Sequence, residues 1–192
     1  DIRYRDLNND GVIDVNDATY IGFPETPRIT YGFSGFINYK NFEFSFAFQG
    51  SGKRSFFMDP SKLSPFVDDH AMLKAIYEDN MVRKPFWPRL STFNLVQHNP
   101  EENWYDPKAA EVRKSTYFMR ECRFLRCTSL ELAYNMPKQL MNRWKLQNMK
   151  FFVRANNPFL ITNFKIWDVE LGESGFNYPI QKTWAVGLNF SF

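Results

Sequence analysis

The sequence lacks the features by which several functional classes are recognised. No run approaches the roughly 18 consecutive apolar residues of a membrane-spanning helix, and no basic run interleaved with aromatic residues indicates a nucleic-acid partner. The net charge of +3 is also too small to argue for nucleic acid. The H-E-x-x-H, G-x-S-x-G and Gly-rich phosphate-binding motifs are absent, and the only histidines, His70 and His98, have no cysteine pair nearby. We therefore expect no enzymatic activity and no nucleic-acid binding.

Cysteine is scarce, and an initiator methionine is missing. The only two cysteines, Cys122 and Cys127, are five residues apart and would face opposite sides of a strand, so we expect unpaired thiols. The chain begins with Asp1 and carries no signal peptide. We therefore expect it to be part of a longer polypeptide.

Aromatic residues are abundant, at 18% of the chain with 21 Phe, and many of them alternate with small or polar residues. The last nine residues alternate in this way. As a strand, one face would carry Trp184, Val186, Leu188, Phe190 and Phe192, and the other Ala185, Gly187, Asn189 and Ser191. One apolar side and one small or polar side is typical of a strand between lipid and the lumen of an outer-membrane barrel.

Five stretches alternate in this way, and they predict an all-β fold. The predicted strands cover 29–39, 42–49, 123–134, 149–155 and 184–192. Lys40 and Asn41 would form a two-residue hairpin turn, with Asn41 accepting a positive φ. The connections alternate between short and long, as periplasmic turns and extracellular loops do in outer-membrane barrels. The long ones cover 50–121, with a short helix expected within 67–80, and 157–179. With the first turn periplasmic, the last strand would also end in the periplasm.

Five strands cannot close a membrane barrel, whose smallest members have about eight strands. Open sheet edges in lipid would leave hydrogen-bonding groups unsatisfied, so the barrel interpretation requires further strands upstream. The alternative is a secreted β-sandwich, in which the Phe-rich faces pack a protein core while the loops bind calcium and glycan. A third interpretation, an enzyme within a barrel, would need an acid/base pair in the lumen, and Glu43 and Glu131 are too isolated to provide one.

One segment has the pattern of a calcium site. Residues 6–17 read D-x-N-x-D-G-x-I-D-x-x-D, which spaces oxygen ligands around a single ion. The candidate ligands are the side chains of Asp6, Asn8 and Asp10, the backbone carbonyl of Val12, Asp14 directly or through water, and Asp17. Gly11 would permit the sharp turn, and Ile13 would tuck inward. Asp17 replaces the Glu of an EF-hand, as in the calcium loops of dockerin-like modules. The alternative is a solvated Asp/Asn turn.

Aromatic residues also occur in the long polar, Pro-bearing connection. Trp87, Trp104 and Tyr105 could stack on sugar rings or hold a peptide. The simpler alternative is that such residues pack the loop into a small core of its own.

Several spaced motifs resemble one family, the SusC-like (RagA-type) TonB-linked outer-membrane proteins of Bacteroidetes. The resemblance covers nearly all 192 residues. The matching stretches are Ile2–Gly11 with Asp14 and Asp17, Gly22 with Pro24 and Pro27, Tyr39–Phe42, Phe48–Gly50, Pro88–Arg89, Ser115–Pro137 with Phe124–Arg126 and Leu132–Tyr134, Asn157–Phe159, Asp168–Glu170, and Tyr178–Pro179. Cys127, Thr128 and Val169 depart from the family's usual residues without disturbing the strand pattern.

The resemblance implies a fold and a function. The chain would be the C-terminal part of a 22-stranded antiparallel transmembrane β-barrel in the cell outer membrane, with long extracellular loops and an upstream N-terminal plug. Residues 1–28 would form an extracellular loop segment with bound Ca²⁺, and residues 29–192 the last five strands. TonB would energise import of glycans or peptides, and a SusD-like lipoprotein would cap the barrel. Gly187, Phe190 and Phe192 would form the signal read by the barrel-assembly machinery.

Overall fold

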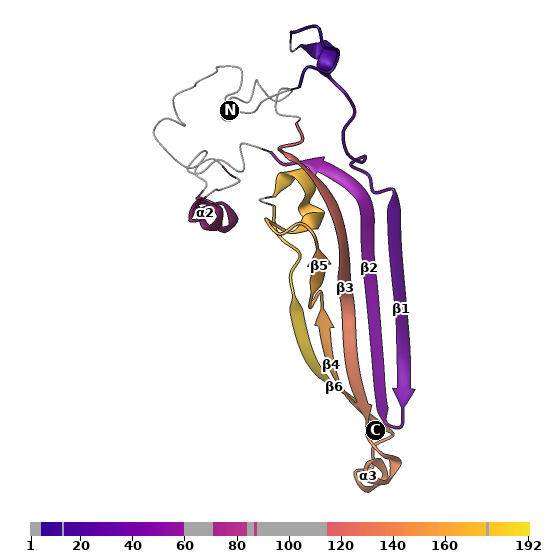
Figure 1. Cartoon of the computed structure of the whole chain (residues 1–192). Helices are drawn as coiled ribbons and strands as arrows, with labels where there is room; N and C mark the ends of the chain where they lie inside the picture. The colour runs from indigo at the N-terminus through magenta and orange to yellow at the C-terminus, as the bar shows by residue number, and fades with distance from the viewer. Residues whose placement is uncertain (1–4, 13, 60–70, 84–86, 88–114, 176) are drawn as a thin grey trace. The chain divides into compact units, whose positions relative to one another are not determined.

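The computed structural model describes residues 5–12, 14–59, 71–83, 87, 115–175 and 177–192. Its main feature is a six-stranded sheet in which the strand order is β1-β2-β3-β4-β6, with β5 paired to β3 (Figure 1). The strands are β1 (Ile29–Tyr39), β2 (Phe42–Phe57), β3 (Met119–Asn135), β4 (Asn148–Asn156), β5 (Leu160–Thr162) and β6 (Thr183–Ser191). The helices are η1 (Val15–Asp17), α2 (Lys74–Asn80), α3 (Lys138–Arg143) and η5 (Val169–Ser174). Within the described ranges, no helix is long and apolar enough to cross a membrane.

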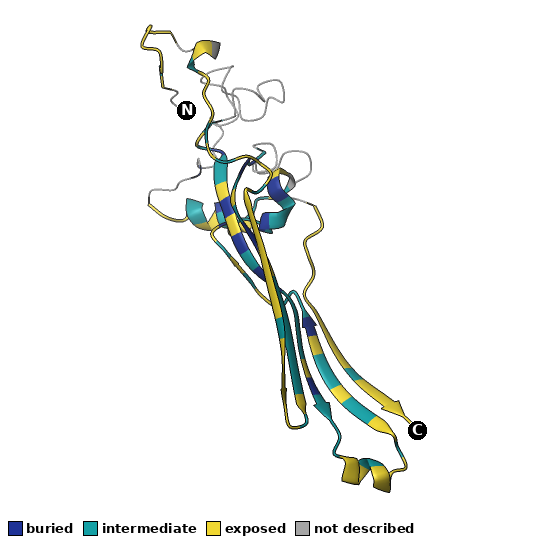
Figure 2. Cartoon of the chain, turned by 90° about the vertical axis from the view of Figure 1, so that its right-hand side faces the viewer, coloured by how far each residue is buried: buried dark blue, intermediate teal, exposed yellow. Residues whose placement is uncertain are grey.

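The chain divides into two compact units. The sheet unit comprises 26–53, 122–165 and 178–192, and the loop unit comprises 1–25, 54–121 and 166–177. In the sheet unit the side chains are mostly exposed or half-buried, whereas the loop unit has a small core of its own (Figure 2). That core contains the buried side chains of Phe56, Met58, Phe118 and Val169.

The register of the sheet unit follows from antiparallel pairing between neighbouring strands. Phe33 faces Phe48 across β1 and β2, and Leu132 faces Val153 across β3 and β4. Val153 in turn faces Val186 on β6. Because side chains alternate across a strand, this register aligns the apolar residues of each strand on one side of the sheet.

The short connections lie at one end of the sheet unit, together with Phe192 (Figure 1). The β1–β2 turn consists of two residues, Lys40 and Asn41, and α3 lies in the connection between β3 and β4. The positive φ of the hairpin turn falls on Lys40, at 54°, and Asn41 does not share it. The prediction for this turn was therefore right in position but wrong in the residue that adopts the left-handed conformation.

Three cross-strand pairs place an aromatic ring over a glycine. They are Tyr31 with Gly50, Gly35 with Phe46, and Phe152 with Gly187. A Cβ added to Gly187 would lie 2.2 Å from Cζ of the Phe152 ring, so only hydrogen fits beneath that ring. Such pairs fix the strand register, because the ring covers a gap that the glycine leaves in the sheet.

All five predicted strands are present, and the antiparallel β fold is confirmed. The first strand was placed correctly at both ends, whereas β2 and β3 extend beyond their predicted ranges. The helix expected within 67–80 begins only at Lys74 in the described residues, and residues 67–70 of that prediction lie outside them. The short strand β5 and the helix α3 were not predicted. Both cysteines are buried, and neither forms a disulfide, as expected.

Candidate functional site

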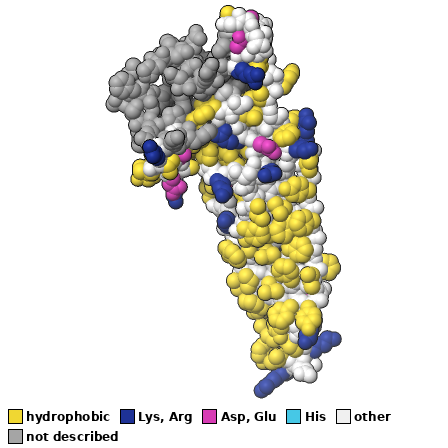
Figure 3. All heavy atoms as spheres, viewed as in Figure 1, with side chains coloured by type: hydrophobic (Ala, Val, Ile, Leu, Met, Phe, Trp, Pro, Cys, Tyr) yellow, Lys and Arg dark blue, Asp and Glu magenta, His cyan; other side chains and the backbone are white. Residues whose placement is uncertain are grey.

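The sheet unit presents one continuous apolar face, which we call the apolar face. It comprises Tyr31, Phe33, Gly35, Ile37 and Tyr39 of β1, Phe42, Phe44, Phe46 and Phe48 of β2, Thr128, Leu130, Leu132 and Tyr134 of β3, Met149, Phe151, Val153 and Ala155 of β4, and Trp184, Val186, Leu188 and Phe190 of β6. Hydrophobic side chains gather over the strands in the space-filling view (Figure 3). Many of them are well exposed, including Trp184 and Val186, both at 69%. A face of this kind is rare on a soluble monomer and marks an interaction surface.

Ring contacts connect the strands across the apolar face. Phe33 stacks on Phe48 with ring centroids 4.9 Å apart and an interplanar angle of 13°. Phe42 meets Tyr134 at 4.9 Å, which links β2 to β3. These contacts are lateral, between neighbours on one surface, so they leave the outer side of the rings open.

The opposite side of the sheet, which we call the polar face, carries mostly small, polar and charged residues. It comprises Gly32, Ser34, Phe36 and Asn38 of β1, Glu43, Ser45, Ala47 and Gln49 of β2, Ser129, Glu131, Ala133 and Asn135 of β3, Lys150, Phe152, Arg154 and Asn156 of β4, and Thr183, Ala185, Gly187, Asn189 and Ser191 of β6. Phe152 is one of its two aromatic residues. Gly187 accommodates its ring, and the Arg154 guanidinium lies 5.7 Å from the ring centroid.

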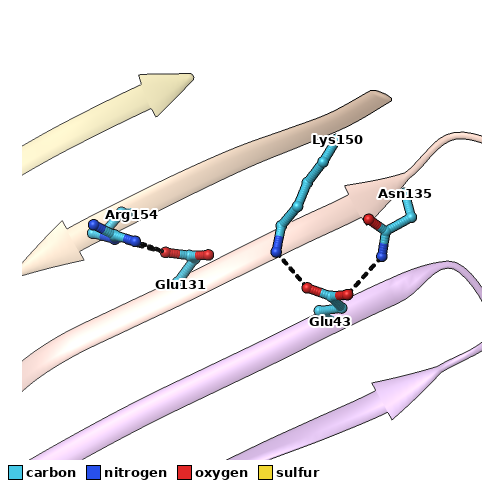
Figure 4. A network of polar contacts seen from close by, with 5 residues as sticks. All are labelled: Glu43, Glu131, Asn135, Lys150 and Arg154. Atoms are coloured by element: carbon cyan, nitrogen blue, oxygen red, sulfur yellow. Dashed lines mark hydrogen bonds and ion pairs between the residues drawn. The ribbon is translucent and has the colours of Figure 1, made fainter. Parts of the chain in front are cut away.

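Charged groups on the polar face are paired across strands (Figure 4). The Glu43 carboxylate on β2 accepts a hydrogen bond of 2.7 Å from Nδ2 of Asn135 on β3, and it forms an ion pair with Nζ of Lys150 on β4. One carboxylate therefore links three strands. Glu131 on β3 accepts a 2.6 Å bond from Nε of Arg154, its direct cross-strand partner on β4.

These pairs change the interpretation of the two glutamates. The sequence pattern left Glu43 and Glu131 isolated, whereas the structure gives each a cationic partner from another strand. A carboxylate neutralised by a neighbouring cation is a structural or electrostatic element, and no ion pair or hydrogen bond in the described strands joins either glutamate to a second carboxylate. Sequence reasoning missed Asn135, Lys150 and Arg154. Alternate positions in the predicted strand 149–155 already placed Lys150 and Arg154 on this face, whereas Asn135 lies one residue beyond the predicted strand 123–134.

The Asp/Asn-rich segment forms a loop in which side-chain oxygens accept bonds from backbone amides. Asp6 accepts from the N–H groups of Asn9 and Gly11 at 2.6 and 2.9 Å. Asp10 accepts from Val12 at 2.8 Å. Gly11 has a φ of +83°, which is the sharp turn that the motif requires.

The last acidic position closes this loop onto itself. Asp17 accepts from the amides of Asp14 at 2.9 Å and Leu7 at 2.7 Å, and these bonds hold the pKa of its carboxyl below the ordinary value. Asp14 accepts from the Asn16 amide at 2.8 Å, and Asn8 from the Asp10 amide at 3.0 Å. Each side chain is thus bound to the loop backbone, and the described part of the chain contains no converging group of three or more His, Cys, Asp or Glu side chains. Ile13 lies outside the described residues.

Of the three loop aromatics predicted to bind a ligand, Trp87 is the one that lies within the described residues. It is buried, at 6% exposed, and packs edge-on against Tyr117 with centroids 5.8 Å apart. The Arg120 guanidinium lies 5.6 Å from the Trp87 ring centroid. Burial raises the pKa of the Tyr117 hydroxyl to about 12. Trp87 therefore contributes to a loop core, and Trp104 and Tyr105 lie outside the described residues, so a ligand-binding role for the three stays a prediction.

The residues predicted as an assembly signal lie on β6 and just after it. Gly187 faces Phe152 on the polar face, whereas Phe190 belongs to the apolar face. The rings of Phe190 and Phe192 meet edge-on at 5.5 Å, and both side chains are exposed.

A long antiparallel sheet with one exposed apolar face and one polar face has the architecture of outer-membrane-type barrel strands. Comparison with known proteins agrees. No protein-family model matches the chain. It is 28% identical to the TonB-dependent receptor SusC of Bacteroides thetaiotaomicron, covering 97% of this chain and 17% of SusC. It is 25% identical to a TonB-dependent receptor of Formosa agariphila, covering 99% of this chain and 19% of that receptor.

Solved structures show the same fold. The structure of the RagAB peptide importer in its open-open state matches 94% of this chain and 19% of that chain, with a TM-score of 0.63 and 19% identity. The structure of the RagAB peptide transporter matches with a TM-score of 0.62. The chain spans about a fifth of the length of the curated relatives that it matches. These matches confirm the resemblance drawn from the sequence motifs: the chain resembles part of a SusC-like TonB-dependent receptor.

Proposed function

We propose that this chain is part of a TonB-dependent transporter of the outer membrane, in which β1, β2, β3, β4 and β6 cross the membrane. The apolar face would contact lipid, and the polar face would line the barrel interior. The complete barrel would have about 22 strands, these five being its last, with a plug upstream. TonB would energise it, a SusD-like lipoprotein would cap it, and glycans or peptides would be its cargo. The relatives named as TonB-dependent receptors and as a peptide importer support this proposal.

The exposed apolar face carries the proposal. The strands β1, β4 and β6 have 11, 9 and 9 residues. Strands of about 9–11 residues, tilted by about 45°, span the hydrocarbon core of a bilayer. These three strands therefore have the length that the proposal requires, whereas β2 and β3 are longer, with 16 and 17 residues. The apolar residues of the five strands lie on one side of the sheet.

The polar face supports a wet interior. The side chains of Glu43 and Lys150 are 39% and 26% exposed, so water reaches the ion pair. On the lipid side such a pair would be costly, because the hydrocarbon core offers no water to solvate it.

The alternative of a secreted β-sandwich requires a second protein layer over the apolar face. The described strands all belong to a single sheet. That observation favours lipid over a second sheet as the cover of this face.

Spin labels on β6 of the full-length receptor, reconstituted in lipid vesicles, test the proposal. Cysteines carrying the labels would replace Val186 and Leu188 on the apolar face or Ala185 and Asn189 on the polar face. Labels on the apolar face should collide with oxygen, which concentrates in lipid, more than with a water-soluble nickel complex. Labels on the polar face should not show this preference for oxygen. Low collision rates with both reagents on the apolar face would support the sandwich and refute the membrane assignment.

We also propose that the loop of residues 6–17 binds Ca²⁺. Asp6, Asn8, Asp10, Asp14 and Asp17 would supply side-chain oxygens and Val12 its carbonyl, the oxygen-rich set that this ion prefers. The hydrogen bonds that backbone N–H groups donate to Asp6, Asp10 and Asp17 hold the loop in a turn that keeps these residues together. Isothermal titration of the receptor should show one calcium site that is lost in Asp10→Ala. Absence of binding heat in the unmodified receptor at millimolar calcium would refute the site.

We further propose that Gly187, Phe190 and Phe192 act as a signal for the barrel-assembly machinery. The exposed, mutually packed rings of Phe190 and Phe192 support this role, because they present an apolar edge that another protein can bind. Deleting Phe192 should lower insertion into the outer membrane, and unchanged surface levels would contradict the role.

A further inference from the structure

We propose that the turn end of the sheet unit binds the phosphate groups of anionic phospholipids. The binding residues are four cations, Lys40 in the β1–β2 turn and Lys138, Arg143 and Lys145 in the β3–β4 connection, which we call the turn cluster. This inference rests on the proposed membrane function and adds a lipid-specific site to it.

The turn cluster carries positive charge that no described carboxylate neutralises. All four side chains lie on exposed residues. The stretch from Met136 to Met149 contains no Asp or Glu. The nearest acidic residue of the hairpin, Glu43, is already bound to Lys150 and Asn135. An anion from outside the chain would therefore complement this surface.

The position of the turn cluster indicates lipid as the source of that anion. Antiparallel pairing brings the β1–β2 turn and α3 to the same end of the sheet unit (Figure 1). In the space-filling view, basic side chains lie at this end, next to the hydrophobic surface (Figure 3). The apolar face ends here with Tyr39, Phe42 and Tyr134. Lipid that covers the apolar face would therefore place its headgroups beside the cluster.

Aromatic residues accompany the cations in the manner of a membrane interface. Trp144 lies between Arg143 and Lys145 and is 52% exposed. The Lys40 ammonium lies 5.3 Å from the centroid of the Tyr39 ring. Exposed Trp and Tyr at headgroup level, beside Lys and Arg that extend toward phosphates, are typical of residues at the boundary between hydrocarbon and water.

The backbone conformation determines which neutral residues can replace two of these lysines. Lys40 and Lys145 both have a φ of 54°, a left-handed conformation in which Gly or Asn is favoured. Lys145 also occupies the usual glycine position of a Schellman cap. Its N–H donates to Asn142 O at 3.3 Å, and the next N–H, of Leu146, donates to Met141 O at 3.0 Å. Lys53, at the opposite end of the strands, has a similar φ of 52°, so this conformation is not particular to the turn cluster. Asparagine suits all three positions, which allows the lysines to be neutralised without disturbing the backbone.

The test uses the full-length receptor in phosphatidylcholine vesicles that contain brominated phosphatidylglycerol or brominated phosphatidylcholine at equal fractions. Bromine quenches tryptophan fluorescence only at close range. The fluorescence of Trp144 is obtained as the difference in fluorescence between each protein and its Trp144→Phe variant. The fluorescence of Trp184, on the apolar face, is obtained in the same way with a Trp184→Phe variant. Trp144 should be quenched more strongly by the anionic lipid, whereas Trp184 should be quenched by both lipids.

A cluster variant separates charge from folding. It combines Lys40→Asn, Lys138→Gln, Arg143→Gln and Lys145→Asn, and the two Asn substitutions suit the positive φ, so the turns should be kept. The matched control neutralises four cations at the opposite end of the same strands, with Arg28→Gln, Lys53→Asn, Lys165→Gln and Lys182→Gln. Relative affinity for the anionic lipid at Trp144 should fall by at least about five-fold in the cluster variant, the effect of one juxtamembrane cation. It should stay unchanged in the control.

The possible outcomes separate the two proposals. Equal quenching of Trp144 by both lipids, or a preference that survives in the cluster variant, would overturn the lipid site while Trp184 still reports a membrane-embedded sheet. Quenching of Trp184 by neither lipid would overturn the membrane function and the lipid site together.

Discussion

An arginine placed at successive positions of β1 should report both the orientation and the depth of this strand. Phe33 lies on the apolar face, where it stacks on Phe48, and is 52% exposed. Ser34, the next residue, lies on the polar face opposite Ala47. Tyr39 lies on the apolar face at the last position of the strand. The three sites share one strand but should meet different environments. Phe33 should meet lipid in the middle of the membrane, Ser34 the barrel interior, and Tyr39 the membrane interface.

The expected magnitudes follow from the geometry. A strand tilted by about 45° rises about 2.4 Å per residue along the membrane normal, so Phe33 lies about 14 Å from Tyr39, near the middle of an apolar band of about 25 Å. Arginine there costs about 2–4 kcal/mol, and the lost ring stacking adds about 0.5–1.5 kcal/mol. Phe33→Arg should therefore lower the free energy of unfolding by about 3–5 kcal/mol. Ser34→Arg should change it by about 0.5 kcal/mol, and Tyr39→Arg should cost about 0–1 kcal/mol.

The measurement is the urea midpoint for refolding of the full-length receptor into lipid vesicles, converted to a free-energy difference with a common slope. Phe33→Leu is the matched control, because it removes the stacking without adding a charge. Equal costs for Phe33→Arg and Ser34→Arg would show that both faces meet the same environment and would refute the assignment of faces. A cost for Tyr39→Arg as large as that for Phe33→Arg would refute the depth.

Three further predictions follow from individual contacts. Gly187→Ala should lower the unfolding free energy by about 1–3 kcal/mol, because the new Cβ meets the ring of Phe152. Gly52→Ala has open space around it and should be nearly neutral in the same denaturation assay. A double-mutant cycle with Glu43→Gln and Lys150→Met should give a coupling of about 1 kcal/mol or less that shrinks with salt; a salt-independent coupling several times larger would indicate a dry barrel interior. The raised pKa of Tyr117 means that its neutral form is favoured in the folded state, so the unfolding free energy should fall as pH rises from about 10 through about 12. The Tyr117→Phe variant should lose this dependence on pH. If the variant and the unmodified protein had the same pH profile, the Tyr117 hydroxyl would not be buried.

The sequence alone determined much of the sheet, because strand residues alternate between two environments and the alternation is visible in the residue types. Both ends of β1 could be placed correctly, since a sharp change from alternating aromatics to Lys40 and Asn41 marks the turn. The two-faced character of β6 was visible for the same reason. The Asp/Asn loop was recognisable from local spacing, and Gly11 does adopt the positive φ that its motif requires.

Other features were decided by contacts between distant segments. The bond from Lys150 to Glu43 joins residues 107 positions apart, and no local pattern encodes which cation meets which carboxylate. The fit of Phe152 over Gly187 likewise depends on the register between β4 and β6. β5 exists because it pairs with β3, and its three residues are too few to show a period of their own.

The physical reason for this division is that side-chain alternation is a property of one strand, whereas register is a property of two. A strand's own sequence shows which residues belong to the same face, but a shift of the pairing by two residues would preserve both faces and change every cross-strand partner. The sequence therefore determined that this chain has an apolar and a polar face. Only the tertiary structure decided that Glu43 meets Lys150, that Glu131 meets Arg154, and that the cations of two separate turns gather at one end of the sheet.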